Sequence, residues 1–355
     1  MHHILGLLQV FQQNQSEQFV LGVLEEGELF QRASAAGIQT VHFSNATRVS
    51  IPLLYKMIAY IKREKISVVH THGPRANVYA NILRKLIPFQ WVVTIHSHPL
   101  HDFIHKGRYG NILSKLNIHA VKHADRVIAI SEPFRTSLTN AGVQDGRIIT
   151  ALNGIDFHKQ IDRPYEKSDF GFAEDDFIIL MVARLEHVKG HHTALEAFSA
   201  FLSKKHKCHI LLVGDGSLKK ALMDYATMLG ITNQVHFMGN RNDADRFYHM
   251  ADVTMLTSFS ESFPLVLLES ARANTPVIST DVGGVRELIL DRSIGWKVQP
   301  GNIMELTAAM EDALRLYKKG MLSAIGKNLK THASDKFTVE KFAENVYNIY
   351  ISMDK

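Results

Sequence analysis

The chain has 355 residues, 46% of them hydrophobic, which is enough apolar material for the cores of two domains of ordinary size. This composition excludes a disordered or fibrous protein, and the single cysteine, Cys208, excludes an internal disulfide. No apolar run approaches the length of about 18 residues that a membrane-spanning helix needs, and we expect a cytoplasmic protein.

The net charge of +5 comes from the first half of the chain. Residues 1–165 contain 18 Lys and Arg against 11 Asp and Glu, whereas the remainder contains 22 against 24. The basic half could be drawn to an anionic membrane surface at the inner face of the membrane or to an anionic substrate, or it could be an ordinary solvated surface. Because no basic stretch is interleaved with aromatic residues, we expect no nucleic-acid partner.

Residues 1–13 carry apolar side chains at positions 4, 5, 8 and 11, a spacing that predicts a helix. A strand pattern follows in residues 19–25, although no strand precedes the helix. Because a parallel strand reached by a helix normally completes a β-α-β unit, we expect that the natural chain begins upstream of Met1. The first domain would then lack its first strand here. Alternatively, this product is itself a fragment with little activity.

Short apolar or β-branched runs then alternate with longer helical patterns along the whole chain. The runs that predict strands are 19–25, 40–43, 67–72, 91–97 and 126–131 in the first half, and 177–183, 209–214, 235–239, 253–258, 275–280 and 295–300 in the second. Continuous apolar strands between helices indicate parallel sheets that are covered on both faces. The sequence therefore predicts an α/β protein with two doubly wound, Rossmann-like domains.

A turn-rich stretch at 153–169, with Asn153-Gly154 and Pro164, predicts the linker between these domains. We expect an N-terminal, acceptor-side domain at 1–160, a C-terminal domain at 161–335, and a last helix at 336–355 that packs back toward the first domain. Ligands of such sheets bind at the carboxyl ends of the strands, so the cleft between two sheets is the default site.

Two cations follow the first strand of the second domain. Arg184 and Lys189 lie in the short loop that leads to a helix beginning at His191. Two cations at a helix N-terminus suit a multiply charged anion such as a diphosphate, although an isolated pair of this kind is usually two solvated loop charges. The next strand ends in a second tight turn, Gly214-Asp215-Gly216, whose glycines could serve only the turn.

A carboxylate interrupts the apolar helical run that follows Glu261. Glu269 falls where a helix this apolar has almost no solvated face, so something must hydrogen-bond to it. Ribose hydroxyls are a suitable partner, as in nucleotide-binding Rossmann domains. Glu261 precedes the helix, at the mouth of the same expected cleft, where a loop acid could also simply stabilise the helix dipole.

Histidines end two strands of the first half. His96 and His72 could face a ligand, and the pairs His70/His72 and His96/His98 each place two imidazoles on one face of a strand. No third ligand occurs at a characteristic spacing, so we expect no metal site. The run Asp243-Ala244-Asp245 imitates a metal-binding motif, but it opens a helix, where acids cap the first turn and complement the dipole.

The sequence resembles the GT-B, family 4 group of retaining glycosyltransferases. Six motifs in order carry the resemblance over nearly the whole chain: NGID (153–156), ARLEHVKG (183–190), LLVGDGSL (211–218), VHFMGNRND (235–243), ESFPLVLLE (261–269) and PVISTDVGGVRELI (276–289). The second domain of that family binds a nucleotide sugar. The resemblance implies Arg184 and Lys189 on the diphosphate, Glu261 near the sugar hydroxyls, Glu269 on the ribose, and His96 facing the donor sugar.

The same resemblance implies Gly214 in the donor site and the nucleobase near the strand end from Met238 to Arg241. Many relatives have Gly-Phe-Gly after the first glutamate, whereas this chain has Ser262-Phe263-Pro264. The backbone donors of Ser262 and Phe263 remain, but Pro264 has none, so some contacts to the sugar would differ.

The implied reaction moves a sugar from a nucleotide-diphosphate sugar, with retention of its configuration, to a glycan, lipid-linked or small-molecule acceptor. We expect it to need neither a metal nor a further cofactor, because Arg184 and Lys189 can stabilise the departing diphosphate. Two alternatives remain: a catalytically inactive nucleotide-sugar-binding protein, and a nucleotide-sugar epimerase, which the two spaced glutamates fit less well.

Overall fold

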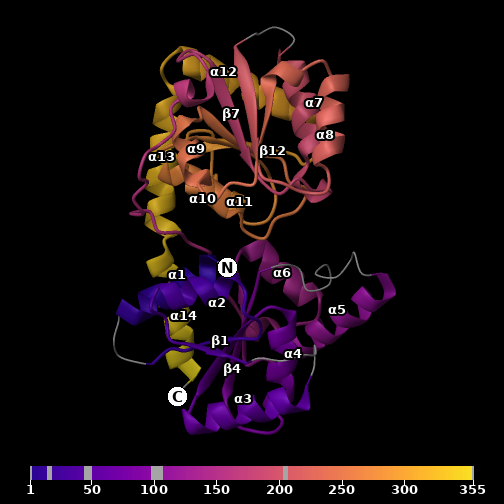
Figure 1. Cartoon of the computed structure of the whole chain (residues 1–355), viewed down its shortest axis with the longest axis vertical. Coiled ribbons are helices and arrows are strands. Elements are labelled where there is room, and N and C mark those ends of the chain that lie inside the picture. Colours follow the sequence, from indigo (N-terminus) through magenta and orange to yellow (C-terminus); the bar gives the residue numbers. More distant parts are fainter. Residues whose placement is uncertain (1, 14–17, 44–49, 97–106, 203–206, 354–355) are drawn as a thin grey trace. The chain divides into compact units, whose positions relative to one another are not determined.

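The computed structural model describes residues 2–13, 18–43, 50–96, 107–202 and 207–353, and it divides into two compact units (Figure 1). Unit 1 comprises residues 1–156 and 338–355, and unit 2 comprises residues 157–337. The chain therefore leaves unit 1 once and returns to it for its last helix. The sequence placed these two boundaries at 160/161 and 335/336.

Unit 1 alternates helices with parallel strands. Its helices are α1 (His2–Gln13), α2 (Glu28–Ala35), α3 (Ile51–Arg63), α4 (Pro74–Leu83), α5 (Gly107–Val121), α6 (Glu132–Asn140) and α14 (Val339–Met353). Its strands are β1 (Leu21–Val23), β2 (Thr40–His42), β3 (Val68–His72), β4 (Gln90–Ile95), β5 (Arg126–Ala129) and β6 (Ile148–Thr150). The predicted first helix is confirmed, and only β6, with three residues, lacked a recognisable strand pattern.

The strands of unit 1 form two separate parallel sheets. β1 pairs with β2, and β3, β4, β5 and β6 pair in that order. Within the described strands, β3 has a neighbour on one side only, because it pairs with β4 and with no other strand.

Helices α1 and α14 share the core that covers one face of the four-stranded sheet. Leu7 and Phe11 of α1 are buried against Phe342 and Val346 of α14, in a cluster that also contains Val92 of β4. A parallel bridge between Ile155 and Thr338 pairs the segment that leaves unit 1 with the segment that returns to it. The C-terminal helix is therefore an integral part of the core of unit 1.

Unit 2 is a doubly wound domain with one six-stranded parallel sheet. Its strands are β7 (Phe177–Val182), β8 (Cys208–Val213), β9 (Val235–Gly239), β10 (Val253–Leu256), β11 (Val277–Thr280) and β12 (Gly295–Val298), in the order β12-β11-β10-β7-β8-β9. Its helices are α7 (His191–Leu202), α8 (Lys219–Met228), α9 (Ala244–Met250), α10 (Leu265–Arg272), α11 (Val285–Leu288), α12 (Ile303–Lys318) and α13 (Leu322–Lys336). All six strands were predicted from apolar runs.

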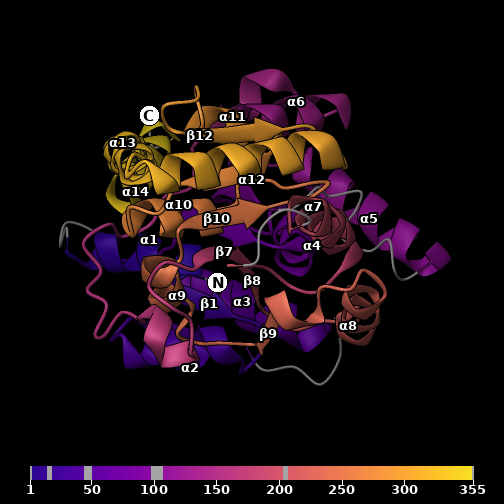
Figure 2. The ribbon, with the colours of Figure 1, turned by 90° about the horizontal axis from the view of Figure 1, so that it is seen from above.

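Helices cover both faces of this sheet, as Figures 1 and 2 show. α7, α8 and α12 bury one face, with Phe198 and Met310 in their core, and α9 and α10 lie on the other, with Phe247 in theirs. β7 is central, and its run FIILMV is buried on both sides apart from the partly exposed Val182. The fold class predicted from the sequence, two Rossmann-like domains with parallel sheets, is confirmed.

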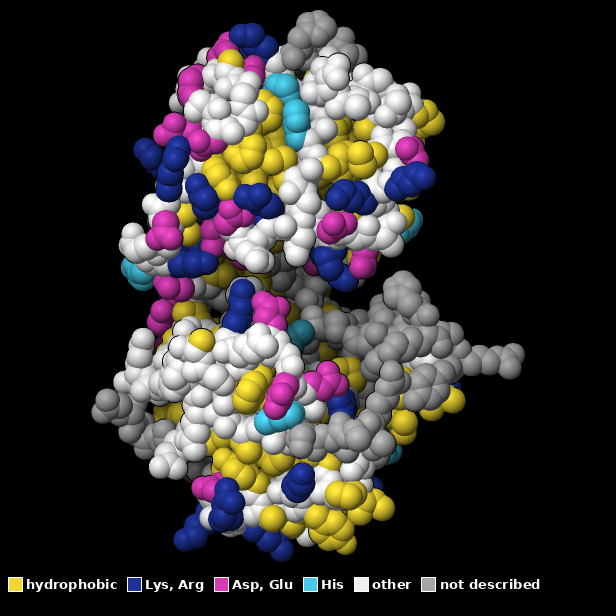
Figure 3. Space-filling view, in the orientation of Figure 1, with side chains coloured by type: hydrophobic (Ala, Val, Ile, Leu, Met, Phe, Trp, Pro, Cys, Tyr) yellow, Lys and Arg dark blue, Asp and Glu magenta, His cyan; other side chains and the backbone are white. Residues whose placement is uncertain are grey.

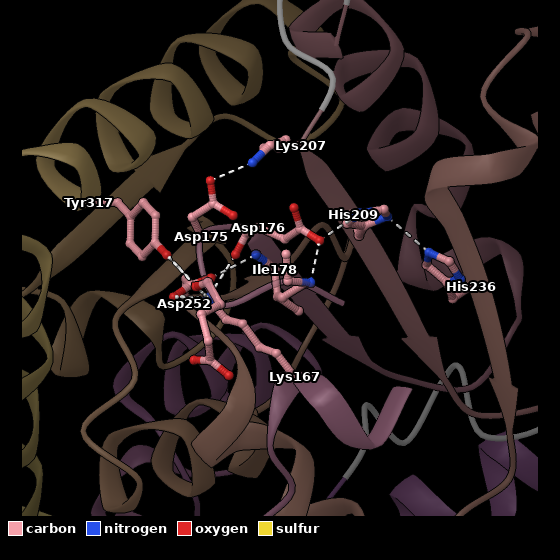
Figure 4. Close-up of polar contacts among 11 residues, drawn as sticks. Lys167, Asp175, Asp176, Ile178, Lys207, His209, His236, Asp252 and Tyr317 are labelled. Atoms are coloured by element: carbon pink, nitrogen blue, oxygen red, sulfur yellow. Dashed lines mark hydrogen bonds and ion pairs between the residues drawn. The ribbon is translucent and has the colours of Figure 1, made fainter. Parts of the chain in front are cut away.

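A buried charge network holds the amino ends of these strands (Figure 4). The ammonium of Lys167, whose side chain is 10% exposed, lies 3.0 Å from the Asp252 carboxylate and donates to the Tyr317 hydroxyl at 3.2 Å. The Asp252 carboxylate also accepts from the backbone N–H of Ile178, at 2.8 Å. Because parallel strands bind ligands at their carboxyl ends, this network at the opposite ends anchors the segment that enters β7.

Candidate functional site

The loop after β7 is held tightly against the loop after β10. A 3-10 turn (His187–Lys189) leads to Gly190, whose φ is 68°, and α7 begins directly after it. A Cβ atom on Gly190 would lie 2.1 Å from the Thr257 carbonyl oxygen. The Thr257 hydroxyl donates to the carbonyl oxygens of Lys189 and Gly190 at 2.9 and 3.1 Å. The backbone of Lys189 is thus fixed at the N-terminus of α7.

Lys189 and Glu261 form an ion pair. The ammonium nitrogen lies 2.5 Å from Glu261 Oε1, and the two side chains are only 19% and 12% exposed. The Ser258 hydroxyl donates to the same carboxylate oxygen at 2.6 Å. The structure therefore brings together two of the residues predicted from the sequence, and it adds Ser258, which the sequence analysis did not single out.

Arg184 is in a different environment from Lys189. Its guanidinium pairs with Glu186 at 3.0 Å, but 69% of the side chain is exposed. Water therefore screens this pair, whereas it has little access to Lys189. The sequence grouped these two cations together, but Arg184 is exposed to solvent and Lys189 is enclosed.

The turn after β8 packs on the end of β7 without room for a side chain. Gly214 has a φ of 145°, and a Cβ atom there would lie 2.0 Å from the Ala183 carbonyl oxygen. Its N–H donates to the Gly239 carbonyl oxygen at 2.8 Å, which ties the end of β8 to the end of β9. Only glycine fits at this position, because the Ala183 backbone leaves no room for a Cβ atom and the φ angle disfavours other residues.

Glu269 finds its intramolecular partner in a tyrosine. The Tyr248 hydroxyl, from α9, donates to Glu269 Oε2 at 2.8 Å. Burial raises the pKa of Glu269 above its usual value, although the bond from Tyr248 acts in the opposite direction. Tyr248 itself is fully buried, and burial raises its pKa as well. The carboxylate in the apolar helix is therefore held by a hydrogen bond from Tyr248, and its role toward ribose stays a prediction.

The residues after Glu261 belong to the packing that supports the site. The ring of Phe263 is buried, with its centroid 5.3 Å from that of Phe337. The carbonyl oxygen of Ser262 accepts from the Gly284 N–H at 3.0 Å, and a Cβ atom on Gly284 would lie 2.2 Å from the Phe263 ring. The turn at 281–284 thus backs the loop that carries Glu261, while backbone contacts of Ser262 and Phe263 to a sugar stay a prediction.

The predicted nucleobase region contains a charge cluster. Met238 is partly buried at the end of β9, and the Arg241 guanidinium donates to both carboxylate oxygens of Asp243 at 2.8 Å and to the Tyr165 hydroxyl at 2.7 Å. The bond from Arg241 lowers the pKa of Asp243 to about 2. These contacts hold Arg241 in one orientation, and the place of the base stays a prediction.

The prediction that the Asp243 side chain caps helix α9 is wrong. Asp243 occupies the N-cap position of α9, but its side chain makes no cap hydrogen bond and binds Arg241 and Tyr165 instead. Asp245 pairs with Arg272 and Lys159. Ion pairs with nearby cations outcompete the backbone N–H groups for both carboxylates. No group of three His, Cys, Asp or Glu residues in the described ranges is arranged to hold a metal ion.

Unit 1 contains a cluster of histidines at the carboxyl ends of β3 and β4. His72 Nδ1 lies 3.0 Å from His96 Nε2, and the ring of His3, from α1, lies against that of His96 with centroids 4.8 Å apart. His70 is hydrogen-bonded to the hydroxyls of Tyr350 and Thr94, at 2.5 and 2.7 Å. His98 lies outside the described residues. His96 belongs to unit 1, and its contact with a donor sugar stays a prediction.

Burial keeps these four histidines neutral. It lowers the pKa of His70 to about 3 and that of His96 to about 4, and it lowers the pKa values of His3 and His72 well below their usual range. For His3, His70 and His72 the neighbouring histidines lower the pKa further, because a charge on one ring disfavours a charge on the next.

The sequence analysis did not identify Tyr248, Ser258 or His3. Ser258 had a usable signal, since it follows strand β10 by two residues and so falls at the ligand-binding edge of the sheet. Tyr248 lies within a short helix and His3 at the start of α1, where nothing in the local pattern distinguishes them from packing residues. Their contacts are made by elements far away in the sequence.

Two family descriptions match the two halves of the chain. Residues 3–159 match Glycosyltransferase Family 4, and residues 162–331 match Glycosyl transferases group 1. The chain is 25% identical over 307 residues to N-acetyl-alpha-D-glucosaminyl L-malate synthase of Bacillus anthracis, a match that covers 84% of this chain and 78% of the relative. It is 26% identical over 317 residues to UDP-Gal:alpha-D-GlcNAc-diphosphoundecaprenol alpha-1,3-galactosyltransferase of Escherichia coli, covering 86% and 79%.

Solved structures share the fold over the full length. HepE of Anabaena in complex with UDP has a TM-score of 0.83 to this chain at 20% identity, covering 99% of this chain and 95% of HepE. The lipopolysaccharide outer core galactosyltransferase WaaB has a TM-score of 0.76 at 19% identity, covering 99% and 94%. These structures show that the fold is GT-B, and the two family matches show that the chain belongs to the glycosyltransferases, with a family 4 domain followed by a group 1 domain.

Proposed function

We propose that this protein transfers a sugar, with retention of its configuration, from a nucleotide-diphosphate sugar to a cell-envelope glycan, glycolipid or small-molecule acceptor. The observation that carries the proposal is Lys189, an enclosed cation at the N-terminus of α7, 2.5 Å from Glu261. A cation and a helix N-terminus at the carboxyl end of a parallel sheet favour a bound diphosphate. The adjacent carboxylate can accept hydrogen bonds from sugar hydroxyls.

In this proposal the bond between the anomeric carbon and the diphosphate oxygen breaks as the acceptor oxygen forms its bond on the same face. The acceptor proton passes to the departing phosphate, so neither Glu261 nor another side chain has to act as a nucleophile. Lys189 and the solvated Arg184 stabilise the negative charge that grows on the leaving group. Glu261 positions the sugar.

We assign the rest of the nucleotide to the residues around Glu269. Its carboxylate would accept from ribose hydroxyls, the backbone at Gly214 would approach the diphosphate, and the base would lie near Met238 and Arg241. Uracil is the first base to test, because HepE was solved with UDP and with UDP-glucose, and the Escherichia coli relative is named for UDP-Gal.

The test is turnover of a panel of UDP-, GDP- and ADP-sugars in the presence of lipid and glycan acceptor extracts. We expect release of the nucleoside diphosphate at an unchanged rate in excess chelator, because Lys189 and Arg184 supply the cations, and we expect a retained anomeric configuration in the product by NMR. Binding of sugar nucleotides without release of diphosphate from any of them would support the inactive-protein alternative. Loss of turnover in chelator, restored by Mg²⁺ or Mn²⁺, would contradict the metal-independent mechanism.

A lipid-linked acceptor would bring the protein to a membrane, and unit 1 has a protein surface that suits binding to anionic lipid. Helices α3, α4 and α5 contain no Asp or Glu, and α4 contacts both of the others. Their outer surface exposes Ile51, Tyr55, Ile112 and Leu116 beside lysines such as Lys115. Figure 3 shows hydrophobic and basic side chains next to one another over α3. Apolar and cationic side chains without acids are typical of surfaces that bind anionic lipid. None of the described helices is long and apolar enough to cross a membrane.

We expect the protein to sediment with vesicles of equal parts phosphatidylglycerol and phosphatidylcholine, and to be released as salt rises from about 0.05 to 0.5 M. The double substitution Ile112→Glu and Leu116→Glu should abolish sedimentation, because it removes apolar contacts and adds negative charge. The matched control is Met228→Glu with Met304→Glu, two exposed apolar residues of unit 2, which should leave sedimentation unchanged. Equal losses in both variants would contradict an assignment of the surface to α3, α4 and α5.

A further inference from the structure

The enclosed lysine of the candidate site already has a counter-ion. Glu261 lies 2.5 Å from the ammonium of Lys189, and neither side chain is more than one-fifth exposed. In such a pair the opposite charges compensate each other, and removing one partner leaves a poorly solvated charge behind. A diphosphate that approaches Lys189 therefore meets a carboxylate that both competes for the ammonium and repels the phosphate oxygens.

Glu261 is also held so that it cannot simply turn away. Ser258 donates to its Oε1 at 2.6 Å, and the Ser258 carbonyl oxygen in turn accepts from the buried Thr280 hydroxyl at 2.7 Å. From the other side, a Cβ atom on Gly283 would lie 2.2 Å from the Glu261 carbonyl oxygen, so the turn at 281–284 is packed directly against the loop. These contacts fix the backbone of Glu261, and the bond from Ser258 favours a carboxylate that lies beside Lys189.

We infer that Glu261 is the internal counter-ion of Lys189 and makes the site prefer an intact sugar nucleotide to the spent nucleoside diphosphate. The inference rests on the proposed function, because it takes the diphosphate to bind at Lys189. When a sugar nucleotide binds, hydroxyls of the sugar donate to Glu261 and replace the lysine as its partner. When the nucleoside diphosphate binds alone, no such donors arrive, and the carboxylate opposes the phosphate.

The consequence for the reaction is a site that changes preference as the sugar leaves. Before transfer, Lys189 and Glu261 each have a partner in the donor, one in the diphosphate and one in the sugar. After transfer, the sugar has moved to the acceptor, and Glu261 regains Lys189 at the expense of the product. Glu261 is thus a specificity-determining residue that weakens binding of the product relative to the substrate.

The neighbouring pair Arg184–Glu186 provides the contrast. It is also a pair of opposite charges, and it lies on the loop that carries Lys189, but Arg184 is 69% and Glu186 36% exposed, so water screens their interaction. Glu186 should therefore have little influence on the choice between the two ligands, and Glu186→Gln makes the same charge change as Glu261→Gln in a solvated setting.

The experiment measures, by calorimetry, the dissociation constants of UDP and of UDP-glucose, UDP-galactose and UDP-N-acetylglucosamine for the wild type, Glu261→Gln and Glu186→Gln. We expect Glu261→Gln to bind UDP about tenfold more tightly than the wild type, as for a close and poorly solvated charge pair. It should bind the best sugar nucleotide no more tightly, so that the ratio of the two constants falls about tenfold. Glu186→Gln should keep the wild-type ratio. Glu261→Asp, which retracts the carboxylate by one methylene, should fall between the wild type and Glu261→Gln.

Weaker or unchanged binding of UDP by Glu261→Gln, in a variant with a wild-type melting temperature, would overturn the inference and leave the proposed function standing. An equal fall of the ratio in Glu186→Gln would overturn it too, because a general change of charge would then account for the effect. If Glu261→Gln does not fold, the same ratio in Glu261→Asp decides. Absence of binding of UDP, GDP and ADP and their sugars to the wild type would overturn the proposed function, and the inference with it.

Discussion

Lys189→Ala lowers the rate of sugar transfer by about 10²–10³, because it removes the enclosed cation that stabilises charge on the leaving diphosphate. The variant should also lose affinity in proportion to the number of phosphates, so that a nucleoside diphosphate is affected more than a monophosphate and a nucleoside is unaffected. The matched control is Lys207→Ala, whose side chain is 66% exposed and pairs with Asp175 at the amino ends of the strands. It should retain wild-type kinetics.

Glu269→Ala tests the other end of the nucleotide in the same assay. It should weaken binding of ribonucleotides and spare their 2′,3′-dideoxy analogues, with a loss of about 1.5 to 3 kcal/mol for a hydrogen bond to a charged group. Tyr248→Phe, which removes the hydroxyl that Glu269 accepts from, separates the protein partner from the ribose. Equal losses for every ligand in Lys189→Ala and Glu269→Ala would defeat the assignment of phosphate to one residue and ribose to the other.

Unit 1 is expected to lose most of its stability as the pH falls from about 6.5 toward 4. Burial lowers the pKa of His70 from 6.5 to about 3 and that of His96 to about 4. Between these values and 6.5 the unfolded chain binds protons that the folded chain does not, so stability is complete above pH 6.5 and falls with decreasing pH. Each of the two histidines contributes up to about 1.4 kcal/mol per pH unit, and domains have only about 5–15 kcal/mol in total.

The two tryptophans of the chain allow the units to be followed separately. Trp91 is fully buried in unit 1, and Trp296 lies in unit 2. Urea unfolding of a Trp296→Phe variant at pH 7.5 and pH 5, followed by fluorescence, therefore reports on unit 1. In that background His70→Asn and His96→Asn should each reduce the difference between the free energies of unfolding measured at the two pH values. If the two histidine variants keep the pH difference of the parent variant, the responsible titration lies elsewhere.

The sequence was sufficient to predict unit 2 almost completely. Its strands are buried on both faces, so each appears as an unbroken apolar run such as FIILMV, and Lys189, Gly214 and Glu261 follow three of those runs. Parallel topology alone then places these residues at one edge of the sheet. What the pattern could not supply was the contact between Lys189 and Glu261, because residues 72 positions apart meet only when two loops pack together.

Unit 1 was harder to predict, for reasons that its structure makes clear. β6 has three residues and gives no periodic signal. The histidines of β3 and β4 have partners from both ends of the chain, His3 from α1 and Tyr350 from α14. In the same way, Asp243 was assigned to a helix cap because local patterns favour caps at that position. Arg241, two residues away, and Tyr165, 78 residues away, form stronger bonds with its carboxylate than the backbone offers.

The return of the chain to unit 1 also determines the order in which a ribosome can complete the two units. Phe342, Val346 and Ile349 of α14 belong to the buried cluster that α1 begins, so the core of unit 1 is unfinished until the last residues have been made. Unit 2 is a single continuous segment, residues 157–337, and can fold as soon as α13 emerges. Unit 2 should therefore reach its native structure first. The apolar face of α1 stays uncovered until α14 has been made. Chains truncated after residue 337 and released from the ribosome should show a protease-resistant unit 2 attached to a protease-sensitive first half.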